Sequence, residues 1–309
     1  MIQRKVLITG VNGFIGRAVA RYVAERGWQV IGVSSSSPEN APLGCLVAYY
    51  SLTLPHPQLN SILASHQPDV CIHCAGRASV GASMTDPQSD YYQNAFMTFE
   101  TLNAVRLSAP HCRFIFLSSA AVYGEPDSLP ISEERNQPNP ISPYGFHKWQ
   151  SEQLCLEFYR VFGIATTAVR IFSAYGSGLR RQVAWDICYK ALTSSKLRLQ
   201  GTGRESRDFI HVLDIAGALM TIVEQAPMVG EVYNLAAGKE VTIQELSNII
   251  LGCLDKPVEL EFDGIVPNGN PSNWVADISK VTSLGFEAQI DLSHGIKKLV
   301  DWCKAEVTF

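Results

Sequence analysis

Several features that mark other classes of protein are missing from this sequence. The 309 residues carry a formal net charge of -4 and contain no run of basic side chains, so the charge pattern favours neither nucleic acid nor an anionic membrane as a partner. No apolar stretch approaches the roughly 18 residues that a membrane-spanning helix requires. The first ten residues, MIQRKVLITG, have too short an apolar part for a secretory signal, so we expect a cytoplasmic protein.

The sequence also lacks the paired cysteines of a structural zinc site. Eight cysteines are scattered along the chain, and Cys71 and Cys74 form a C-x-x-C pair. This pair lies in an apolar segment that is typical of a buried strand, where positions i and i+3 face opposite sides. Because no second pair completes a tetrahedral site, we expect free thiols and no bound metal, with His73 as an ordinary core residue.

The order of the apolar segments indicates the fold class. Hydrophobic residues make up 46% of the chain, which is enough for a large core. In the first two-thirds, short apolar runs alternate with helical patterns, as in a doubly wound, Rossmann-type parallel α/β sheet. The expected strands cover residues 5–9, 29–33, 45–49, 70–74, 113–118 and 165–170, and the expected helices cover residues 15–26, 58–66, 91–109 and 143–162.

Beyond residue 174 the elements become shorter and glycines separate them. We expect helices over residues 185–194, 214–224 and 243–254, and strands over residues 198–200 and 232–235. The change predicts a dinucleotide-binding domain over residues 1–175, to which residues 208–238 return. Residues 176–207 and 239–309 then form a smaller α/β substrate-binding lobe, with a ligand cleft between the two parts.

Three glycines follow the first expected strand and open the first expected helix. Gly10, Gly13 and Gly16 allow a tight turn, a close approach to a pyrophosphate and close packing of the helix on the sheet. The free N–H groups and the positive end of the helix dipole then face the anion. We therefore predict a dinucleotide-binding loop that also includes Asn12, Phe14 and Ile15.

The end of the second expected strand bears on the choice of cofactor. NAD-binding proteins usually place a carboxylate there for the ribose hydroxyl, but Ser34 and Ser35 follow this strand and the first acidic residue is Glu39. Serine hydroxyls can donate to a 2′-phosphate, and Arg17 could supply a positive charge, although it could also be an ordinary exposed helix residue. We expect NADP, with NAD as the alternative.

Tyr144 and Lys148 suggest acid–base chemistry. Ser142 and Pro143 precede them and are typical of a helix start, and a spacing of four places the phenol and the ammonium on one helical face. A phenol titrates near ~10, so it needs a nearby cation to act as a base at neutral pH. The pair predicts proton exchange with a sugar or alcohol oxygen, although the same spacing also occurs on ordinary surface helices.

Together with further motifs, these residues resemble the extended short-chain dehydrogenase/reductase family, in the branch that modifies nucleotide sugars. The similarity covers nearly the whole chain. The motifs that carry it are residues 10–16, 73–76, 118–124, 143–148, 170–172, 201–203, 207–212 and 233–235, together with Asn94.

The resemblance implies roles for individual residues. Tyr144 would be the general acid/base, Lys148 would lower its pKa and hold the nicotinamide ribose, and Ser119 would hydrogen-bond the reacting oxygen. Further residues on the cofactor side would be Ala75, Gly76, Asn94 and Ser118.

The resemblance also implies a nucleoside diphosphate sugar as substrate. Arg207 matches an arginine that pairs with the diphosphate, although it could instead form a salt bridge with Asp208. The family's arginine near the C-terminal ribose pocket is not evident around residues 267–271, and Arg181 could replace it. The remaining substrate-side residues would be Ala120 and Ser173.

The expected reaction is hydride transfer at the sugar C4. Dehydration requires an acid and a base next to Ser119, but Ala120 and Ala121 stand there, so we do not expect it. Our main hypothesis is NADPH-dependent reduction of a 4-keto-6-deoxy sugar nucleotide. The alternative is a 4-epimerase of a UDP-glucose or UDP-N-acetylglucosamine type with tightly held NAD, and a cofactor-sensing scaffold protein is a non-enzymatic alternative.

A homodimer is also expected from the resemblance. Its interface would involve the helices over residues 91–109 and 143–162. The side chains concerned are Phe96, Met97, Phe99 and Trp149, which could equally belong to the core of one chain.

Overall fold

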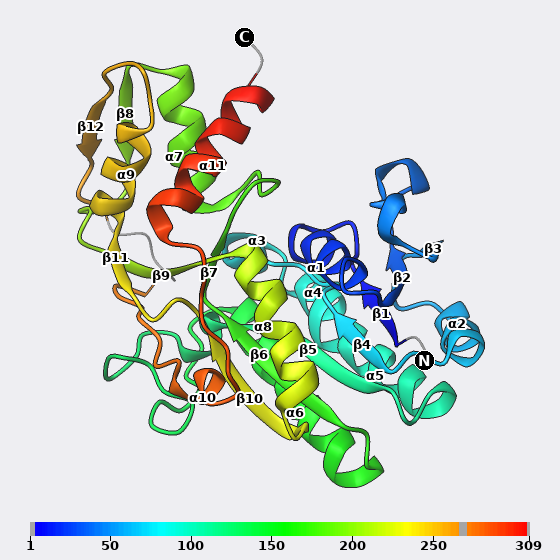
Figure 1. Ribbon diagram of the computed structural model, residues 1–309. Coiled ribbons are helices and arrows are strands. Elements are labelled where there is room, and N and C mark those ends of the chain that lie inside the picture. Colours follow the sequence, from blue (N-terminus) through cyan, green and yellow to red (C-terminus); the bar gives the residue numbers. More distant parts are fainter. Residues whose placement is uncertain (1–3, 266–270, 308–309) are drawn as a thin grey trace.

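A seven-stranded parallel sheet forms the centre of the molecule (Figure 1). The structure, a computed structural model, describes residues 4–265 and 271–307, so most of the segment 267–271 lies outside it. The strand order is β10-β6-β5-β4-β1-β2-β3, which confirms the expected doubly wound, Rossmann-type fold. The strands are β1 (Lys5–Thr9), β2 (Gln29–Ser34), β3 (Ala48–Ser51), β4 (Val70–His73), β5 (Arg113–Ser119), β6 (Thr166–Ile171) and β10 (Val229–Leu235).

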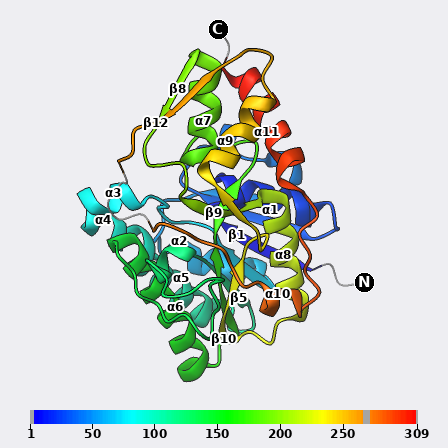
Figure 2. The same ribbon diagram turned by 90° about the vertical axis from the view of Figure 1, so that its left-hand side faces the viewer.

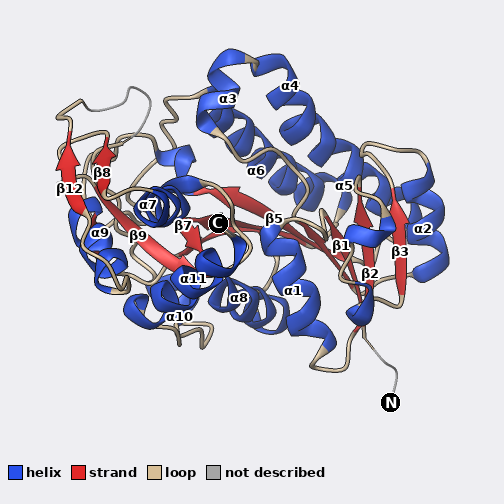
Figure 3. Ribbon diagram, turned by 90° about the horizontal axis from the view of Figure 1, so that it is seen from above, coloured by secondary structure: helices blue, strands red, loops and turns tan. Residues whose placement is uncertain are grey.

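Two helix layers bury the sheet (Figure 3). One layer contains α1 (Phe14–Ala24) and α8 (Val212–Gln225), and its apolar residues form a single cluster with alternate residues of the strands. The other layer contains α2 (Gln58–His66), α5 (Met97–Ser108) and α6 (Pro143–Phe162), which cover the opposite face. Burial on both faces explains why the strands appear in the sequence as short continuous apolar runs.

In the described part of the C-terminal region, two small sheets and the helices α7, α9 and α11 lie together at one end of the molecule (Figure 2). The sheets have the orders β11-β9-β7 and β12-β8, and the helices share a hydrophobic cluster with them. The elements are β7 (Ser173–Tyr175), α7 (Gln182–Thr193), β8 (Lys196–Leu199), β9 (Ser206–His211), β11 (Glu240–Thr242), α9 (Ile243–Gly252), β12 (Glu259–Phe262) and α11 (Leu292–Glu306). The short helix α10 (Ser279–Thr282) lies apart from them and packs against β10 of the large sheet.

The segment after β4 differs from the single helix expected over residues 91–109. Two short helices come first, α3 (Val80–Thr85) and α4 (Pro87–Tyr91), each begun by a side chain that accepts a backbone hydrogen bond. A π-helical turn, η3 (Tyr92–Phe96), then joins α4 to α5. The third strand also begins three residues later than expected, because residues 43–45 form a 3-10 turn.

A buried ion pair connects the sheet to α6. Arg170 on β6 donates from Nε to Glu152 Oε1 at 2.9 Å and from a terminal nitrogen to Oε2 at 2.7 Å. Ser118 adds a hydrogen bond of 2.6 Å to the same carboxylate. The guanidinium also lies over the Tyr123 ring, whose hydroxyl donates to Asn234 on β10 at 2.7 Å. Because these groups satisfy one another, the loss of any charged member leaves a buried group unpaired.

Glu152→Gln is therefore expected to reduce the free energy of unfolding by about 3–5 kcal/mol, since it leaves the Arg170 charge buried without a counter-charge. Chemical denaturation at pH 7 measures this change. Asp255→Asn is the control, because Asp255 forms a 3.0 Å ion pair with Lys304 while 96% exposed. The control should lose less than about 1 kcal/mol. Equal losses in both variants would contradict the structural role of the buried pair.

Candidate active site

The N-terminus of α6 is packed tightly against the end of β5. Ser142 caps the helix by accepting a hydrogen bond from the Gly145 amide at 3.2 Å, and Pro143 occupies the first turn. A β-carbon at Gly145 would lie 2.5 Å from the Ala121 carbonyl oxygen, so only glycine permits this approach. The Tyr144 amide donates to Ser83 Oγ on α3 at 3.1 Å. These contacts hold Tyr144 beside the residues that follow β5.

Burial dominates the acidity of Tyr144. Its side chain is only 7% exposed, and burial raises the pKa of the phenol to about 12, with the nearby Asp90 charge acting in the same direction. A hydrogen bond with Ser119 and the positive charge of Arg181 both lower the Tyr144 pKa. The structure therefore brings Tyr144, Ser119 and Arg181 together, as the resemblance implies for the first two.

Lys148 lies one turn further along α6 and is equally buried. Its Nζ donates to the Leu117 carbonyl oxygen at 3.0 Å and lies 4.7 Å from the centre of the Phe116 ring. Burial lowers the Lys148 pKa to about 8, while the charges of Asp90 and Glu152 partly oppose this shift. The expectation that Lys148 lowers the Tyr144 pKa below its usual range is not met by the protein's own groups, because desolvation of the phenol outweighs every nearby charge.

The glycine-rich loop has the shape expected of a dinucleotide-binding turn. Gly10 has φ +65°, and a β-carbon there would lie 2.7 Å from the Ala75 amide nitrogen. A β-carbon at Gly16 would overlap the Gly10 carbonyl oxygen. The Ala75 amide in turn donates to Thr9 Oγ1 at 3.2 Å, which fixes the end of β4 beside the loop. Gly13 caps α1, whose first turn contains Phe14, Ile15 and Arg17.

Asn94 provides an unpartnered polar atom on the cofactor side. It is 1% exposed and belongs to the π-helical turn, and its Nδ2 donates to the Asp90 carbonyl oxygen at 3.1 Å. Its Oδ1 has no hydrogen-bond partner among the described residues. Gly76 adopts φ +146°, where a β-carbon would lie 3.0 Å from Asn94 Oδ1 and 3.6 Å from Lys148 Nζ. An unpaired acceptor of this kind could receive a hydrogen bond from a ribose hydroxyl of a dinucleotide, so the role expected of Asn94 and Gly76 stays a prediction.

The end of β2 forms the other part of the expected cofactor site. Ser34 and Ser35 lie there, and the Ser36 carbonyl oxygen accepts hydrogen bonds from Tyr49 and Ser51 on β3. The Tyr49 hydroxyl also accepts a 3.0 Å hydrogen bond from Asn12 of the glycine-rich loop. Asn12, Tyr49 and Ser36 thus connect the loop with the segment after β2.

Ser118 differs from its expected role. Its hydroxyl donates to the buried Glu152 carboxylate, so its side chain belongs to the ion-pair network, and a contact between its backbone and the cofactor stays a prediction. Ala120 also differs, since it is 0% exposed and packs in a hydrophobic cluster with Val122 and Phe172. The 3-10 turn at residues 120–123 rotates Ala120 into the core and leaves Ala121 on the cavity wall.

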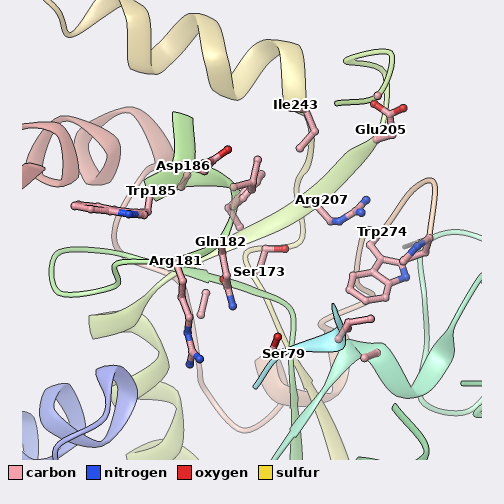
Figure 4. Close-up of a pocket in the computed structure, with 18 of the residues that line it drawn as sticks. Ser79, Ser173, Arg181, Gln182, Trp185, Asp186, Glu205, Arg207, Ile243 and Trp274 are labelled. Atoms are coloured by element: carbon pink, nitrogen blue, oxygen red, sulfur yellow. The ribbon is translucent and has the colours of Figure 1, made fainter. Parts of the chain in front are cut away.

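A cavity of about 1190 Å³ opens beside Tyr144 and Ser119. Figure 4 shows another part of its wall, around Ser173, Arg181 and Arg207. Loop residues after β4, the start of α7 and strands β8 and β9 complete its wall. The expected substrate residues line it, with the exception of Ala120; they are Ser119, Tyr144, Ser173, Arg181 and Arg207. Several other lining residues were not expected from the sequence. Ser79 caps α3 and Val80 begins it, and this helix was not predicted; Gln182 adopts φ +67° at the start of α7.

Arg207 faces this cavity beside Trp274 (Figure 4). A terminal guanidinium nitrogen donates to the Ser206 carbonyl oxygen at 2.7 Å, and the guanidinium lies 5.4 Å from the centre of the Trp274 ring. The alternative salt bridge with Asp208 is absent from the described contacts, because Asp208 accepts the backbone amides of Ala237 and Ala276 instead. The guanidinium is therefore available for an anionic ligand.

Comparisons with known proteins agree with this arrangement. The family model described as "NAD dependent epimerase/dehydratase family" matches residues 6–236. A UDP-glucose 4-epimerase of Rhizobium meliloti is 29% identical over 98% of each chain. The solved structure of UDP-glucuronic acid 4-epimerase from Bacillus cereus, in complex with UDP-glucuronic acid and NAD, is 26% identical with a TM-score of 0.89, over 98% of this chain and 99% of that one.

The chain therefore belongs to the NAD-dependent epimerase/dehydratase family. It is an NAD(P)-dependent enzyme of the extended short-chain dehydrogenase/reductase class that modifies nucleotide sugars, as the motifs indicated. Among the described residues, no helix combines the length and apolar character required to traverse a bilayer. The same residues contain no cluster of three or more potential metal ligands.

The buried ammonium of Lys148 is expected to reduce stability. Its pKa of about 8 lies below the ordinary 10.5, so the unfolded chain binds the proton more tightly. The resulting penalty, roughly 3 kcal/mol, is complete below pH 8 and decreases as the pH rises towards 10.5. Lys148→Met should therefore raise the free energy of unfolding at pH 7 by about 1–3 kcal/mol, after the loss of one hydrogen bond.

Denaturation at pH 7 and pH 10 tests this expectation, with a smaller gain at pH 10. Lys256→Met is a matched control, because Lys256 is exposed but also donates from Nζ to a backbone carbonyl oxygen, that of Leu192 at 2.8 Å. The control should show no gain at either pH. Destabilisation by Lys148→Met at pH 7 would show that burial of this ammonium carries no net penalty.

Proposed function

We propose that this protein is a nucleoside diphosphate sugar 4-epimerase with NAD as its cofactor. The observation that carries the proposal is the placement of Tyr144 and Ser119 on the wall of a large cavity that also contains Arg181 and Arg207. The Rhizobium meliloti and Bacillus cereus relatives, which are named 4-epimerases, support the same reaction. The proposal replaces our main hypothesis, a 4-ketoreductase, with what had been the alternative.

In this proposal each residue has a defined task. The loop of Gly10, Gly13 and Gly16 would hold NAD, which when bound would supply the hydride acceptor and donor for reversible oxidation at the sugar C4. Tyr144 takes the proton of the 4-hydroxyl and gives it back, and Ser119 hydrogen-bonds the reacting oxygen. Lys148 supplies a positive charge behind the phenol. Because burial keeps the Tyr144 pKa at about 12, the phenolate needs the added positive charge of bound molecules to form at neutral pH.

Epimerisation also requires the keto sugar to turn over within the site. The cavity volume of about 1190 Å³ is larger than most ligand pockets, which supports such a movement. Arg207 would hold the diphosphate, and Trp274 beside it would limit movement of that end. The sugar can then present either face while the nucleotide stays in place.

NAD rather than NADP is the cofactor that we propose. The Bacillus cereus relative was solved with NAD, whereas the expectation of NADP rests on Ser34 and Ser35 at the end of β2. The Ser36 carbonyl oxygen, which accepts from Tyr49, adds an acceptor to this segment and no positive charge. The absence of a carboxylate before Glu39 remains the one feature that favours reduction by NADPH of a 4-keto-6-deoxy sugar.

We also propose that the expected division of the chain holds. Residues 1–175 and 208–238 would bind the dinucleotide, and residues 176–207 and 239–309 would bind the substrate. Support comes from β10, which lies at the edge of the large sheet next to β6, and from α8, which packs beside α1.

Tyr144→Phe is expected to lower kcat by about 10²-fold or more, because it removes the proton-exchanging group. The assay follows the interconversion of UDP-hexose C4 epimers by chromatography with no nicotinamide added. Tyr175→Phe is the matched control, since this buried phenol has no hydrogen-bond partner among the described residues and lies outside the cavity wall. The control should keep its kcat.

Two results would contradict the proposal in different ways. Unchanged kcat in Tyr144→Phe would exclude Tyr144 as the acid/base and would favour a cofactor-sensing scaffold. Stoichiometric consumption of NADPH with a 4-keto-6-deoxy sugar nucleotide, and no epimerisation, would favour the ketoreductase.

A homodimer through α5 and α6 is a further part of the proposal. An apolar hollow of about 640 Å³ lies between these helices, and its wall includes Tyr91, Phe96, Phe99 and Trp149. Tyr91 and Phe99 are 42% and 38% exposed, which is unusual for aromatic side chains so close together. Met97, by contrast, is 8% exposed and belongs to the core of its own chain.

Phe99→Arg is expected to convert the dimer to a monomer, because it places a charge in the apolar interface. Sedimentation velocity at micromolar concentration measures the mass. Val47→Arg is the control, since Val47 is 59% exposed on a segment far from α5 and α6 in the sequence. A wild-type monomer, or a Phe99→Arg dimer, would contradict this interface.

A further inference from the structure

A buried carboxylate lies behind the catalytic pair and has no role in the mechanism given above. Asp90 on α4 is 0% exposed, and its Oδ2 lies 2.6 Å from Nδ1 of His147 on α6. The other carboxylate oxygen, Oδ1, has no hydrogen-bond partner among the described residues. Such a carboxylate is costly to bury, so it calls for an explanation beyond packing.

The position of Asp90 links it to both members of the pair. His147 lies between Tyr144 and Lys148 in the sequence, and α4 packs directly against α6. The negative charge of Asp90 raises the pKa of Lys148, and it also raises the pKa of Tyr144. Asp90 is thus the one carboxylate among the described residues that acts on both groups.

Other charged groups near the pair do not replace Asp90. Glu152 is already paired with the Arg170 guanidinium, and burial raises the Cys74 pKa to about 12, so this thiol stays neutral. His73 has a pKa of about 3 and stays neutral too. On the remaining sides, Arg77 lies 4.0 Å from Asp86, and Arg181 acts on Tyr144 from the cavity. No residue of α3 is titratable.

We propose that Asp90, held by His147, is a positioning residue for the pair Tyr144 and Lys148. It sets the pH range in which the two side chains have the protonation states that turnover requires. The inference rests on the proposed function and deepens it. The carboxylate keeps the ammonium of Lys148 charged in its buried site, and it opposes premature ionisation of Tyr144. Both groups therefore keep their protons to higher pH than burial and the cofactor alone would allow.

His147 completes the arrangement at the protein surface. Its side chain is 13% exposed, and its ring meets the Tyr91 ring edge-on with centres 5.5 Å apart. The imidazole therefore has a fixed orientation in which Nδ1 faces Asp90. Nδ1–H donates to the carboxylate in this geometry and stabilises its charge.

Removal of the Asp90 charge should lower the pKa values of both Lys148 and Tyr144. Without it, the pKa of Lys148 falls because the ammonium loses a counter-charge, and the pKa of Tyr144 falls because the phenolate loses a repulsion. Both limbs of the pH profile of kcat therefore move in the same direction, towards lower pH. A purely structural defect would lower kcat at every pH and leave the limbs in place.

Asp90→Asn tests the inference in the UDP-hexose epimerisation assay, with kcat measured from pH 5.5 to 10. We expect the profile to shift by about one pH unit towards acid. Asp86→Asn is the matched control: Asp86 caps the same helix by accepting from the Ser89 amide, and asparagine caps equally well. The control removes the same charge and should leave the profile unchanged.

A second variant and a second measurement keep the test independent of Asp90→Asn folding and of activity. His147→Leu removes the donor that stabilises the carboxylate charge, so its profile should move in the same direction by a smaller amount. A double-mutant cycle of Asp90→Asn and Lys148→Met on the free energy of unfolding should show coupling at pH 7 that is lost at pH 10.

The possible outcomes separate the two proposals. An unshifted profile in Asp90→Asn, or no coupling to Lys148 at pH 7, overturns the role of Asp90. If Tyr144→Phe still abolishes turnover in that case, the epimerase proposal stands. If Tyr144→Phe leaves turnover intact, the epimerase proposal fails irrespective of the Asp90 result.

Discussion

The close contact between the first turn of α6 and the turn after β5 determines the rest of the site. Gly145 lets the helix approach the Ala121 carbonyl oxygen, and this approach buries both Tyr144 and Lys148. Burial then works against the charged form of each, raising the Tyr144 pKa to about 12 and lowering that of Lys148 to about 8. Tyr144 can therefore lose and regain its proton near neutral pH only with help from neighbouring groups.

The neighbouring groups that act on Tyr144 and Lys148 come from separate parts of the chain. Ser119 at the end of β5 and Arg181 before α7 favour the Tyr144 phenolate, whereas Asp90 on α4 opposes it and favours the Lys148 ammonium. Asn94 on the π-helical turn leaves one buried acceptor, Oδ1, without a partner among the described residues. The site is thus a set of buried polar groups that lower the stability of the fold, as is common at the active sites of enzymes.

Local sequence signals were sufficient for much of the fold and for part of the site. Continuous apolar runs placed the strands of the parallel sheet, and Ser142 with Pro143 located the start of α6. Arg207 and Ser173, which were expected to contact the substrate, lie on the cavity wall, and their role there stays a prediction. Asp90 and His147 were missed because they meet only when α4 packs on α6. Ala120 was misplaced because one residue of rotation in a 3-10 turn decides between cavity and core.

An isotope measurement tests the central claim most directly. A UDP-hexose substrate carrying deuterium at C4 is epimerised by the enzyme, and the position of the label in the product is read by NMR. If a buried Tyr144 trades only the hydroxyl proton while the hydride leaves and returns within one closed site, the product epimer keeps its deuterium at C4. Replacement of the deuterium by solvent hydrogen, or its transfer to free cofactor, would contradict the account.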